Sequence, residues 1–276
     1  MRLGIVGQGF VGSAVSAGFG SHFEMETFDL KTPCTCSSIE DLIQKSKVAF
    51  ICVPTPMNPD GSCCLKTVEK VVEEISKADF EDGIVVIKST VPPRTTENLR
   101  NRFPSLSIIF NPEFLTEAHH LEDFRNQNRI ILGGDKSVTS KMAKLYAKVF
   151  PKACMIQTDS TTAEMVKYFT NCFLATKVSF SNDMNQLCSR LGINFNEVVD
   201  HSIKDSRLGN SHWSVPGSDG HYGFGGSCFP KDMNALLFMA QQMSIPVPTI
   251  SGAWETNKLV RPESDWKKLK GRAVTA

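Results

Sequence analysis

The chain has 276 residues, with 30 basic and 29 acidic side chains and a formal net charge of +1. This length allows two domains, and 41% hydrophobic against 21% charged residues is ordinary for a globular protein. The near-zero charge excludes a global field that would recruit nucleic acid or an anionic membrane, so any phosphate recognition must be local.

The N-terminal sequence MRLGIVGQGF has the pattern of a strand that runs into a turn and lacks the features of a secretory leader. No apolar run reaches the length of about 18 residues that a membrane-spanning helix needs, so we expect a cytoplasmic protein. The nine cysteines are an odd number at scattered spacings, without the paired clusters that ligate a metal. We therefore predict no metal site and interpret eight cysteines, all but Cys228, as reduced thiols.

A glycine pattern opens the chain. Gly7, Gly9 and Gly12 follow an apolar strand and precede a helix of small residues, and Asp29 closes the next strand. In that context the glycines permit a tight turn, the approach of a pyrophosphate and close packing of helix on strand. The acid would bind the adenosine ribose hydroxyls and disfavour a 2′-phosphate. The alternative is a glycine-rich turn with an incidental acid, but the complete pattern predicts an NAD site.

Strands and helices alternate as far as residue 150, which predicts a doubly wound parallel sheet. We expect helices over 38–45, 65–78, 95–102 and 138–150, and apolar strands in VAFICV, GIVVIKST, SIIFN and RIILGG. Residues just past the ends of parallel strands face the ligand. Pro54 and Thr55, after one strand, and Thr90, at the end of the next, are therefore expected beside the cofactor.

Glu113 and Glu117 follow the SIIFN strand, and in a helical turn they would share one face. Two acids beside a cofactor suggest water activation or proton transfer, whereas spacing alone favours a solvated acidic turn. We interpret His119 and His120 as surface residues.

A single long helix is predicted next. Thr161 and Glu164 have the spacing of a capping box, and neither glycine nor proline interrupts the chain up to Leu191. A helix of about 30 residues would be roughly 45 Å long and usually bridges domains or subunits. Lys167 and Asn171, four residues apart, would project together, although a solvated helix face is the favoured interpretation of the lysine when the spacing is taken alone.

Expected helices over 196–202 and 233–242 flank a loop rich in glycine, serine and tryptophan, residues 209–227. This loop leads into the motif GFGGSCFPKD. The glycines of the motif bring backbone N–H groups within reach of a ligand, and they come shortly before the Cys228 thiol. A pocket around a reactive sulfur is one interpretation. For a cysteine taken alone, an inert buried thiol after a glycine turn is favoured.

Seven motifs in this order resemble the nucleotide-sugar dehydrogenases: GQGFVG, VPTP, KSTVPP, NPEFLTE, EMVKYFTN, DSRLGN and GFGGSCFPKD. The resemblance extends from residue 2 to about residue 260. It implies that the C6 alcohol of a UDP-glucose-like nucleotide sugar is oxidised to a carboxylate in two two-electron steps, with two NAD⁺. The implied catalytic residues are Cys228 as nucleophile, Lys167 and Asn171 at developing oxyanions, Asp232 orienting water and Lys167, and Glu113 with Thr90 in thioester hydrolysis.

The resemblance also implies binding roles and a homodimer through the helix 161–191. Arg207 would reach across the dimer interface to the neighbouring subunit's substrate. The implied substrate-binding residues are Phe114, Leu115, Lys167, Asn171, Arg207, Phe224, Gly225 and Gly226. The implied cofactor-binding residues are Gly7, Gly9, Phe10, Val11, Gly12, Asp29, Pro54, Thr55, Thr90 and Glu117.

The expected organisation is an NAD-binding domain of Rossmann type (1–158), a helical dimerisation domain (159–260) and a tail (261–276). The tail resembles the first strand of a third, nucleotide-binding domain that family members normally carry and this sequence lacks. Arg94 also stands where the family usually has glycine. Two alternatives follow: a truncated, non-catalytic NAD-binding assembly protein, or a two-domain hydroxyacid dehydrogenase, which performs one oxidation without a cysteine.

Overall fold

The computed structural model describes residues 1–80 and 82–276, and the chain divides into two compact units. The first, here the sheet unit, comprises Met1–Thr55 and Leu65–Lys167. The second, here the helical unit, comprises Pro56–Cys64 and Tyr168–Ala276.

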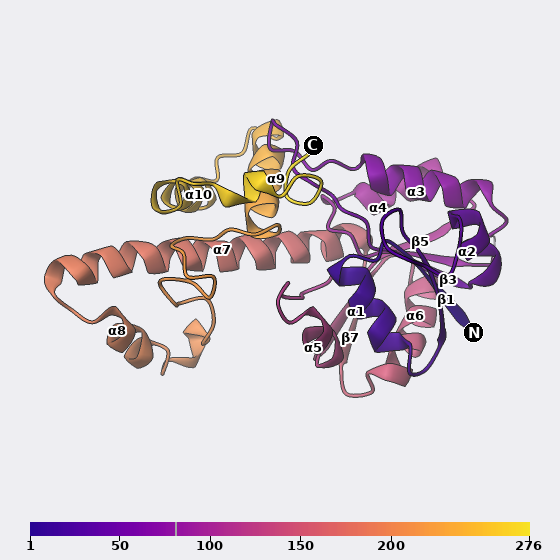
Figure 1. Cartoon of the computed structure of the whole chain (residues 1–276), viewed down its shortest axis with the longest axis horizontal. Coiled ribbons are helices and arrows are strands. Elements are labelled where there is room, and N and C mark those ends of the chain that lie inside the picture. Colours follow the sequence, from indigo (N-terminus) through magenta and orange to yellow (C-terminus); the bar gives the residue numbers. More distant parts are fainter. Residues whose placement is uncertain (81) are drawn as a thin grey trace. The chain divides into compact units, whose positions relative to one another are not determined.

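Seven strands of the described residues form one sheet in the order β2-β1-β3-β4-β5-β6-β7 (Figure 1). They are β1 (Arg2–Val6), β2 (Glu24–Phe28), β3 (Val48–Ile51), β4 (Ile84–Ile87), β5 (Ser107–Phe110), β6 (Arg129–Gly133) and β7 (Cys154–Thr158). The strands from β1 to β5 pair in parallel. Because β1 lies between β2 and β3, the strand order reverses beside it, and the carboxyl ends of β1 and β3 open the crevice that binds ligands in such sheets. The predicted fold class is confirmed.

One strand pair differs from the fully parallel sheet expected. β6 joins β5 through a single antiparallel pair, Phe110 with Gly133, while β6 and β7 are parallel. The helix of this connection, α5 (His120–Arg125), packs against α1 (Phe10–Phe19) and so does not form a crossover between β5 and β6. Gly133 also pairs with Thr158, the last residue of β7. The helix that follows β7 therefore starts near the end of β6, the strand whose last residue pairs with the end of β5.

Helices cover both faces of the sheet (Figure 1). One face packs on α1, α5 and α6 (Lys136–Val149), and the other on α2 (Ile39–Lys45), α3 (Lys66–Lys77) and α4 (Thr95–Arg102). The alternation of strand side chains explains this: in β4, Val85 and Ile87 join one apolar cluster, while Ile84 and Val86 join the other.

The helical unit is built on α7 (Ser160–Leu191), which confirms the predicted long helix. α8 (Phe195–Ser202), the 3₁₀ turn η1 (Ser206–Leu208), α9 (Phe229–Gln242), α10 (Pro248–Val260) and η2 (Asp265–Lys268) complete it. Cys172 and Ala175 of α7 pack with Phe224, Met233 of α9 and Ala253 of α10. α9 begins four residues before the expected Met233, because Pro230 suits the first turn of a helix.

The predicted capping box at the start of α7 is wrong. Asp159 caps the helix instead, accepting hydrogen bonds from the backbone N–H of Thr162 at 2.8 Å and from its hydroxyl at 2.6 Å. Glu164 is fully buried and accepts a hydrogen bond from the backbone N–H of Thr96 in α4. The Glu164 carboxylate, which the local spacing assigns to a helix cap, thus makes a tertiary contact with α4 instead.

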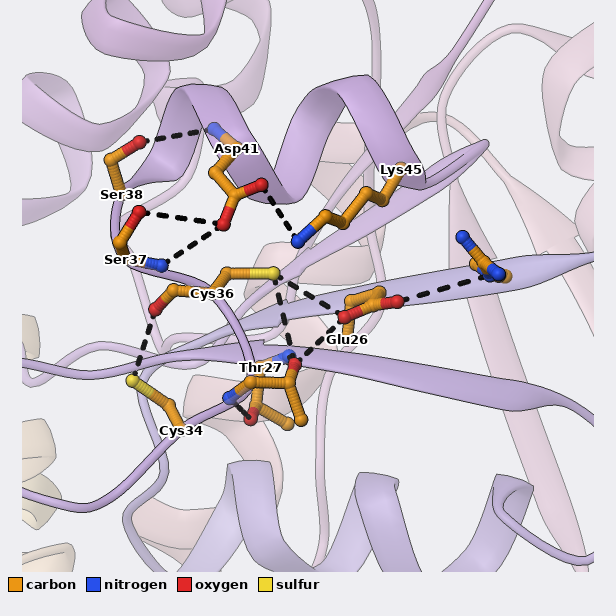
Figure 2. Close-up of polar contacts among 10 residues, drawn as sticks. Glu26, Thr27, Cys34, Cys36, Ser37, Ser38, Asp41 and Lys45 are labelled. Atoms are coloured by element: carbon orange, nitrogen blue, oxygen red, sulfur yellow. Dashed lines mark hydrogen bonds and ion pairs between the residues drawn. The ribbon is translucent and has the colours of Figure 1, made fainter.

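The segment between β2 and α2 is held against β2 by polar contacts (Figure 2). The Thr35 hydroxyl and the Cys36 thiol both donate to the Glu26 carboxylate, at 2.8 and 3.4 Å. The Cys34 thiol donates to the carbonyl oxygen of Cys36 at 3.2 Å. Both thiols are free and serve as hydrogen-bond donors.

Among the described residues no helix is long and apolar enough to cross a membrane.

Candidate active site

The turn after β1 has the geometry that a dinucleotide needs. Gly7 has a φ of 94°, a left-handed conformation that favours glycine. A Cβ on Gly12 would lie 1.9 Å from the carbonyl oxygen of Gly7, so only glycine allows α1 to approach β1 this closely. A Cβ on Gly9 would meet nothing within 4 Å, which leaves open space at the N-terminus of α1. No side chain caps that terminus in the described residues, so its N–H groups can receive a phosphate.

Asp29 lies beside this turn. Its carboxylate accepts hydrogen bonds from the backbone N–H groups of Gln8 and Lys31, both at 2.7 Å, and of Thr32 at 3.1 Å. Partial burial raises the pKa of this carboxyl, but the three N–H donors outweigh burial and lower it overall, so Asp29 is ionised at neutral pH. The buried Nε2 of Gln8 has no partner among the described residues. A polar ligand such as a dinucleotide fits this turn.

The other predicted cofactor residues lie on nearby segments. Phe10 and Val11 begin α1, and the Phe10 ring lies 6.2 Å from that of His120. Pro54 and Thr55 follow β3, and Thr90 follows β4. Thr55 donates its hydroxyl hydrogen to the carbonyl oxygen of Thr90 at 2.8 Å. Strand register thus brings two of these residues into contact.

Glu113 and Glu117 do not share a helical face, because residues 112–116 are irregular. Glu113 is buried, whereas Glu117 lies in an exposed turn before α5. The two acids are therefore in different environments, and neither a helical pair nor a common solvated turn describes them.

The buried Glu113 pairs with Lys167 of α7. The Nζ of Lys167 lies 3.0 Å from Glu113 Oε1 and also donates to the Glu113 carbonyl oxygen at 2.6 Å. The second carboxylate oxygen accepts from the backbone N–H of Leu115 at 2.7 Å. Burial raises the pKa of Glu113, but Lys167 and this N–H outweigh burial and lower it. A solvated helix face for Lys167 is therefore wrong.

Phe114, a predicted substrate residue, has two cations near its ring. Lys167 Nζ is 5.4 Å from the centre of the ring, and the Arg129 guanidinium is 4.3 Å from it. Glu113, Phe114, Leu115 and Arg129 line one cavity of about 540 Å³, together with Lys88, Thr116, Asp123, Phe124 and residues 126–128. The end of the SIIFN strand therefore borders a space that is large enough for a small ligand.

Lys88 was not predicted as a site residue. It is 2% exposed and donates to the Asn111 side chain at 2.8 Å. Burial lowers the pKa of Lys88 to about 8, so this lysine exchanges its proton at a lower pH than an exposed lysine does. The sequence signal was available: Lys88 is a single lysine at the end of an otherwise apolar strand.

In the helical unit, Cys228 is the N-cap residue of α9. Its side chain is only partly buried, and the N-terminus of a helix favours a thiolate there. Lys231 follows in the first turn, and its charge interacts with Cys228, Cys63 and, most strongly, Asp232. Burial lowers the pKa of Lys231, but these partners outweigh burial and raise it, so the ammonium keeps its charge beside the thiol.

Asn171 and Asp232, far apart in sequence, meet in this unit. The Asn171 side chain donates to the Asp232 carboxylate at 2.6 Å, and the other carboxylate oxygen pairs with Lys231. Asp232 is 1% exposed. Asn171 of α7 thus joins Asp232 and Lys231 in a buried network at the first turn of α9, a contact that the sequence did not predict.

Phe224, Gly225 and Gly226 form the loop before Cys228, and two residues that were not predicted hold it. Asn257 hydrogen-bonds to both backbone groups of Phe224, and Arg261 lies against Gly225. No local pattern identified either residue.

Arg207 is exposed in η1 and pairs with Asp205 at 2.5 Å.

No group of three or more His, Cys, Asp or Glu residues in the described chain is placed to hold a metal ion.

Two domain profiles of one family match the chain in order. The NAD-binding domain of the UDP-glucose/GDP-mannose dehydrogenase family matches residues 34–150, and the central domain of that family matches residues 161–259.

Similar proteins carry related names. The UDP-glucose 6-dehydrogenase of Rickettsia prowazekii (strain Madrid E) is 36% identical over 226 residues, which are 80% of this chain and 51% of the relative. UDP-glucose 6-dehydrogenase TuaD of Bacillus subtilis (strain 168) is 34% identical over 235 residues, 82% of this chain and 49% of the relative. The chain thus spans about half the length of these curated relatives.

The solved structure of a UDP-glucose dehydrogenase from the archaeon Pyrobaculum islandicum superposes with a TM-score of 0.86 at 29% identity. It covers 94% of this chain and 68% of that one. The matched family domain is an NAD-binding domain, so the cofactor is NAD; the match begins at residue 34, after the turn around Gly7 and after Asp29. Two consecutive domain matches, the shared sheet and the long helix together place this chain in the UDP-glucose/GDP-mannose dehydrogenase family.

Proposed function

We propose that this chain oxidises the C6 alcohol of a UDP-glucose-like nucleotide sugar to the carboxylate, in two NAD-dependent two-electron steps. The observation that carries the proposal is the position of Cys228, a partly exposed thiol at the N-terminus of α9 beside the charged Lys231. A single alcohol oxidation needs no nucleophile, whereas oxidation of an aldehyde to the acid does.

In the first step the alcohol loses its proton and a hydride to become an aldehyde. When bound, NAD⁺ would supply the hydride acceptor for each of the two oxidations, and the turn around Gly7 together with Asp29 would hold it. We assign Lys167 to the developing oxyanion and to movement of the alcohol proton, with Asn171 supporting the same oxygen. The bond from Lys167 to the Glu113 carboxylate, at 3.0 Å, supports this role because it holds a buried cation at a fixed position.

In the second step the Cys228 sulfur adds to the aldehyde carbon and forms a thiohemiacetal. Loss of a second hydride gives a thioester, and water then releases the carboxylate and restores the thiol. We assign Glu113 and Thr90 to the hydrolytic water, and Asp232 to orienting water and Lys167. Burial raises the pKa of Glu113, but Lys167 and the Leu115 N–H outweigh burial and lower it, so the carboxylate is ionised and can accept a hydrogen bond from the hydrolytic water.

Binding roles follow the same family pattern. The proposed sugar contacts are the backbone of Phe224, Gly225 and Gly226, with Phe114 and Leu115. Asp29 is proposed to hold the adenosine ribose, and Pro54, Thr55, Thr90 and Glu117 to lie along the cofactor.

We also propose that two copies of the chain associate through α7, which would let Arg207 reach the substrate of the partner subunit. An apolar stripe supports this: Phe173, Phe180 and Leu187 recur every seven residues and are 57%, 54% and 55% exposed. A helix turns almost twice in seven residues, so the three side chains lie on one face, and such exposed stripes mark association surfaces. The Arg207 side chain in η1 is 87% exposed in the single chain, so its guanidinium is accessible to a second copy.

The function is tested by counting NADH. With UDP-glucose or a UDP-N-acetylated sugar as substrate, we expect two NADH for each sugar converted to the acid. Cys228→Ser should lower acid formation by roughly 10³-fold or more, because the covalent route is lost. Cys154→Ser, which changes an exposed thiol on β7, is the control and should behave as wild type.

Absence of NADH with every nucleotide sugar, together with calorimetric binding of NAD⁺ alone, would favour a non-catalytic NAD-binding protein. One NADH per molecule of a small hydroxy acid would favour a hydroxyacid dehydrogenase. Unchanged acid formation by Cys228→Ser would reject the proposed nucleophile.

A further inference from the structure

The loop that precedes Cys228 is held by a side chain from a distant helix. Asn257 of α10 is 0% exposed. Its Oδ1 accepts a hydrogen bond from the backbone N–H of Phe224 at 2.7 Å, and its Nδ2 donates to the Phe224 carbonyl oxygen at 3.0 Å. The side-chain amide of Asn257 thus satisfies both the backbone N–H and the backbone carbonyl of Phe224, as a neighbouring β-strand would.

Arg261, directly after α10, holds the same loop from an adjacent position. It is 2% exposed, and its charge is balanced by Asp219 at 2.8 Å and Asp265 at 2.7 Å. Its Nη1 also donates to the carbonyl oxygen of Tyr222 at 3.4 Å. Two carboxylates therefore keep the planar guanidinium in one orientation.

The glycines of the loop fit these two side chains closely. A Cβ on Gly223 would lie 2.3 Å from Asn257 Oδ1, and a Cβ on Gly225 would lie 2.3 Å from Arg261 Nη2. Such distances are shorter than any van der Waals contact. Gly226, by contrast, has open space where a Cβ would project. The contacts with Asn257 and Arg261, here called the clamp, therefore leave no room for a side chain at Gly223 or Gly225. At Gly226, two residues before Cys228, a side chain would project into open space.

We propose that Asn257 and Arg261 are positioning residues that fix the Gly223–Gly226 backbone for the sugar substrate. The proposal rests on the function proposed above, because that function assigns the sugar to this loop. Both residues contact the loop backbone, and the proposed reaction assigns neither of them a chemical role. Their loss should therefore act on sugar binding, through a loop that no longer has a single conformation before binding.

The test compares Asn257→Ala with Ser179→Ala in the full chain. Ser179 is the matched control, because its buried hydroxyl donates to the Ala253 carbonyl oxygen of α10 at 2.6 Å and, among the described residues, makes no hydrogen bond to the loop. Both variants lose one buried polar side chain at the α7–α10 packing. Only Asn257→Ala frees the N–H of Phe224.

Two readouts separate positioning from general stability. By hydrogen–deuterium exchange, we expect the peptide spanning 222–228 to exchange about tenfold faster or more in Asn257→Ala than in Ser179→Ala, with α7 peptides equal. In kinetics, we expect the KM for the nucleotide sugar to rise about tenfold or more in Asn257→Ala, while the KM for NAD⁺ stays within about twofold.

Equal exchange of the loop in the two variants would overturn the proposal, as would faster exchange with an unchanged sugar KM. If Asn257→Ala does not fold, Arg261→Lys carries the same test, since it keeps the charge for Asp219 and Asp265 but loses the planar fork beside Gly225. A wild-type chain that oxidises no nucleotide sugar would overturn the proposed function, and the loop exchange would still decide whether the clamp orders the backbone.

Discussion

Glu113 and Lys167 form an ion pair at 3.0 Å with side chains 5% and 3% exposed. Removing both charges from water is costly, and the pair persists because the Leu115 N–H and the Glu113 carbonyl oxygen satisfy the remaining groups. The pKa of Glu113 lies below its ordinary value of 4.5. This carboxylate therefore stabilises the fold above pH 4.5, and that contribution is lost as the pH falls through the lowered value.

At this scale we predict that Lys167→Met destabilises the fold by about 3–5 kcal/mol at pH 7, because Glu113 is left as an uncompensated buried charge. Adding Glu113→Gln should recover most of that loss, since the neutral amide can still accept from the Leu115 N–H. Urea unfolding of the wild type, the single variant and the double variant measures both changes. A double variant no more stable than Lys167→Met would contradict the interpretation of the pair.

Among the elements, α4 and α7 are joined by one buried carboxylate. Glu164 of α7 accepts the backbone N–H of Thr96 at 2.8 Å, in the first turn of α4, while its other oxygen has no partner among the described residues. Burial raises the pKa of Glu164 to about 7, against the opposing effect of the Thr96 and Arg94 donors. This contact ties the segment that follows Thr90 to the helix that carries Lys167.

The sign of the pH effect follows from this raised pKa. Between pH 4.5 and about 7 the unfolded chain has released the proton that the folded chain still holds. Stability must therefore fall as the pH rises through this window, and the loss is complete above it. Ionised Glu164 thus weakens the fold at pH 8, although its hydrogen bond to α4 remains.

We predict that Glu164→Gln matches the wild type at pH 5 and is more stable by roughly 2–3 kcal/mol at pH 8, because the amide keeps the acceptor and cannot ionise. Urea unfolding at the two pH values measures the difference. Asp159→Asn, at the exposed cap of the same helix, serves as the comparison and should not show this pattern, because the pKa of Asp159 is lowered. An equal stability difference at pH 5 and pH 8 would refute the assignment.

For the whole molecule, the apolar stripe on α7 is the surface that most clearly calls for a partner. Phe169 stacks on Phe173 with ring centres 6.3 Å apart, and both rings are exposed in the single chain. Exposed aromatic side chains in a row would be covered by a second copy that presents the same stripe, as twofold association requires.

We predict that Phe173→Glu combined with Phe180→Glu shifts the protein from dimer to monomer, because two charges would be buried in the interface. Sedimentation velocity at several concentrations measures the shift. Leu259→Glu is the control, since Leu259 lies on α10 and is 80% exposed. A wild-type chain that sediments as a monomer at every concentration would reject the α7 dimer.

Local patterns were sufficient for much of this chain. Apolar runs predicted β1 and β3 to β6, whereas β7 was not predicted. The absence of glycine and proline from Thr161 to Leu191 predicted α7 (Ser160–Leu191). The glycines at 7, 9 and 12 predicted the turn after β1, because backbone geometry at a tight turn restricts the residue type. These features depend on neighbours within a few residues, which a sequence displays directly.

Only the tertiary structure decided which polar side chains are buried and what they contact. Lys167 meets Glu113, Asn171 meets Asp232, and Glu164 meets Thr96, in each case across more than 50 positions of sequence. Spacing alone favoured a solvated face for Lys167 and a helix cap for Glu164, and it offered no sign of Asn257 or Arg261. The residue order of this chain thus determined its elements and motifs, because those follow from short-range geometry. Packing determined the charges, partners and constraints of the site, because burial brings distant residues together and alters the cost of ionising them.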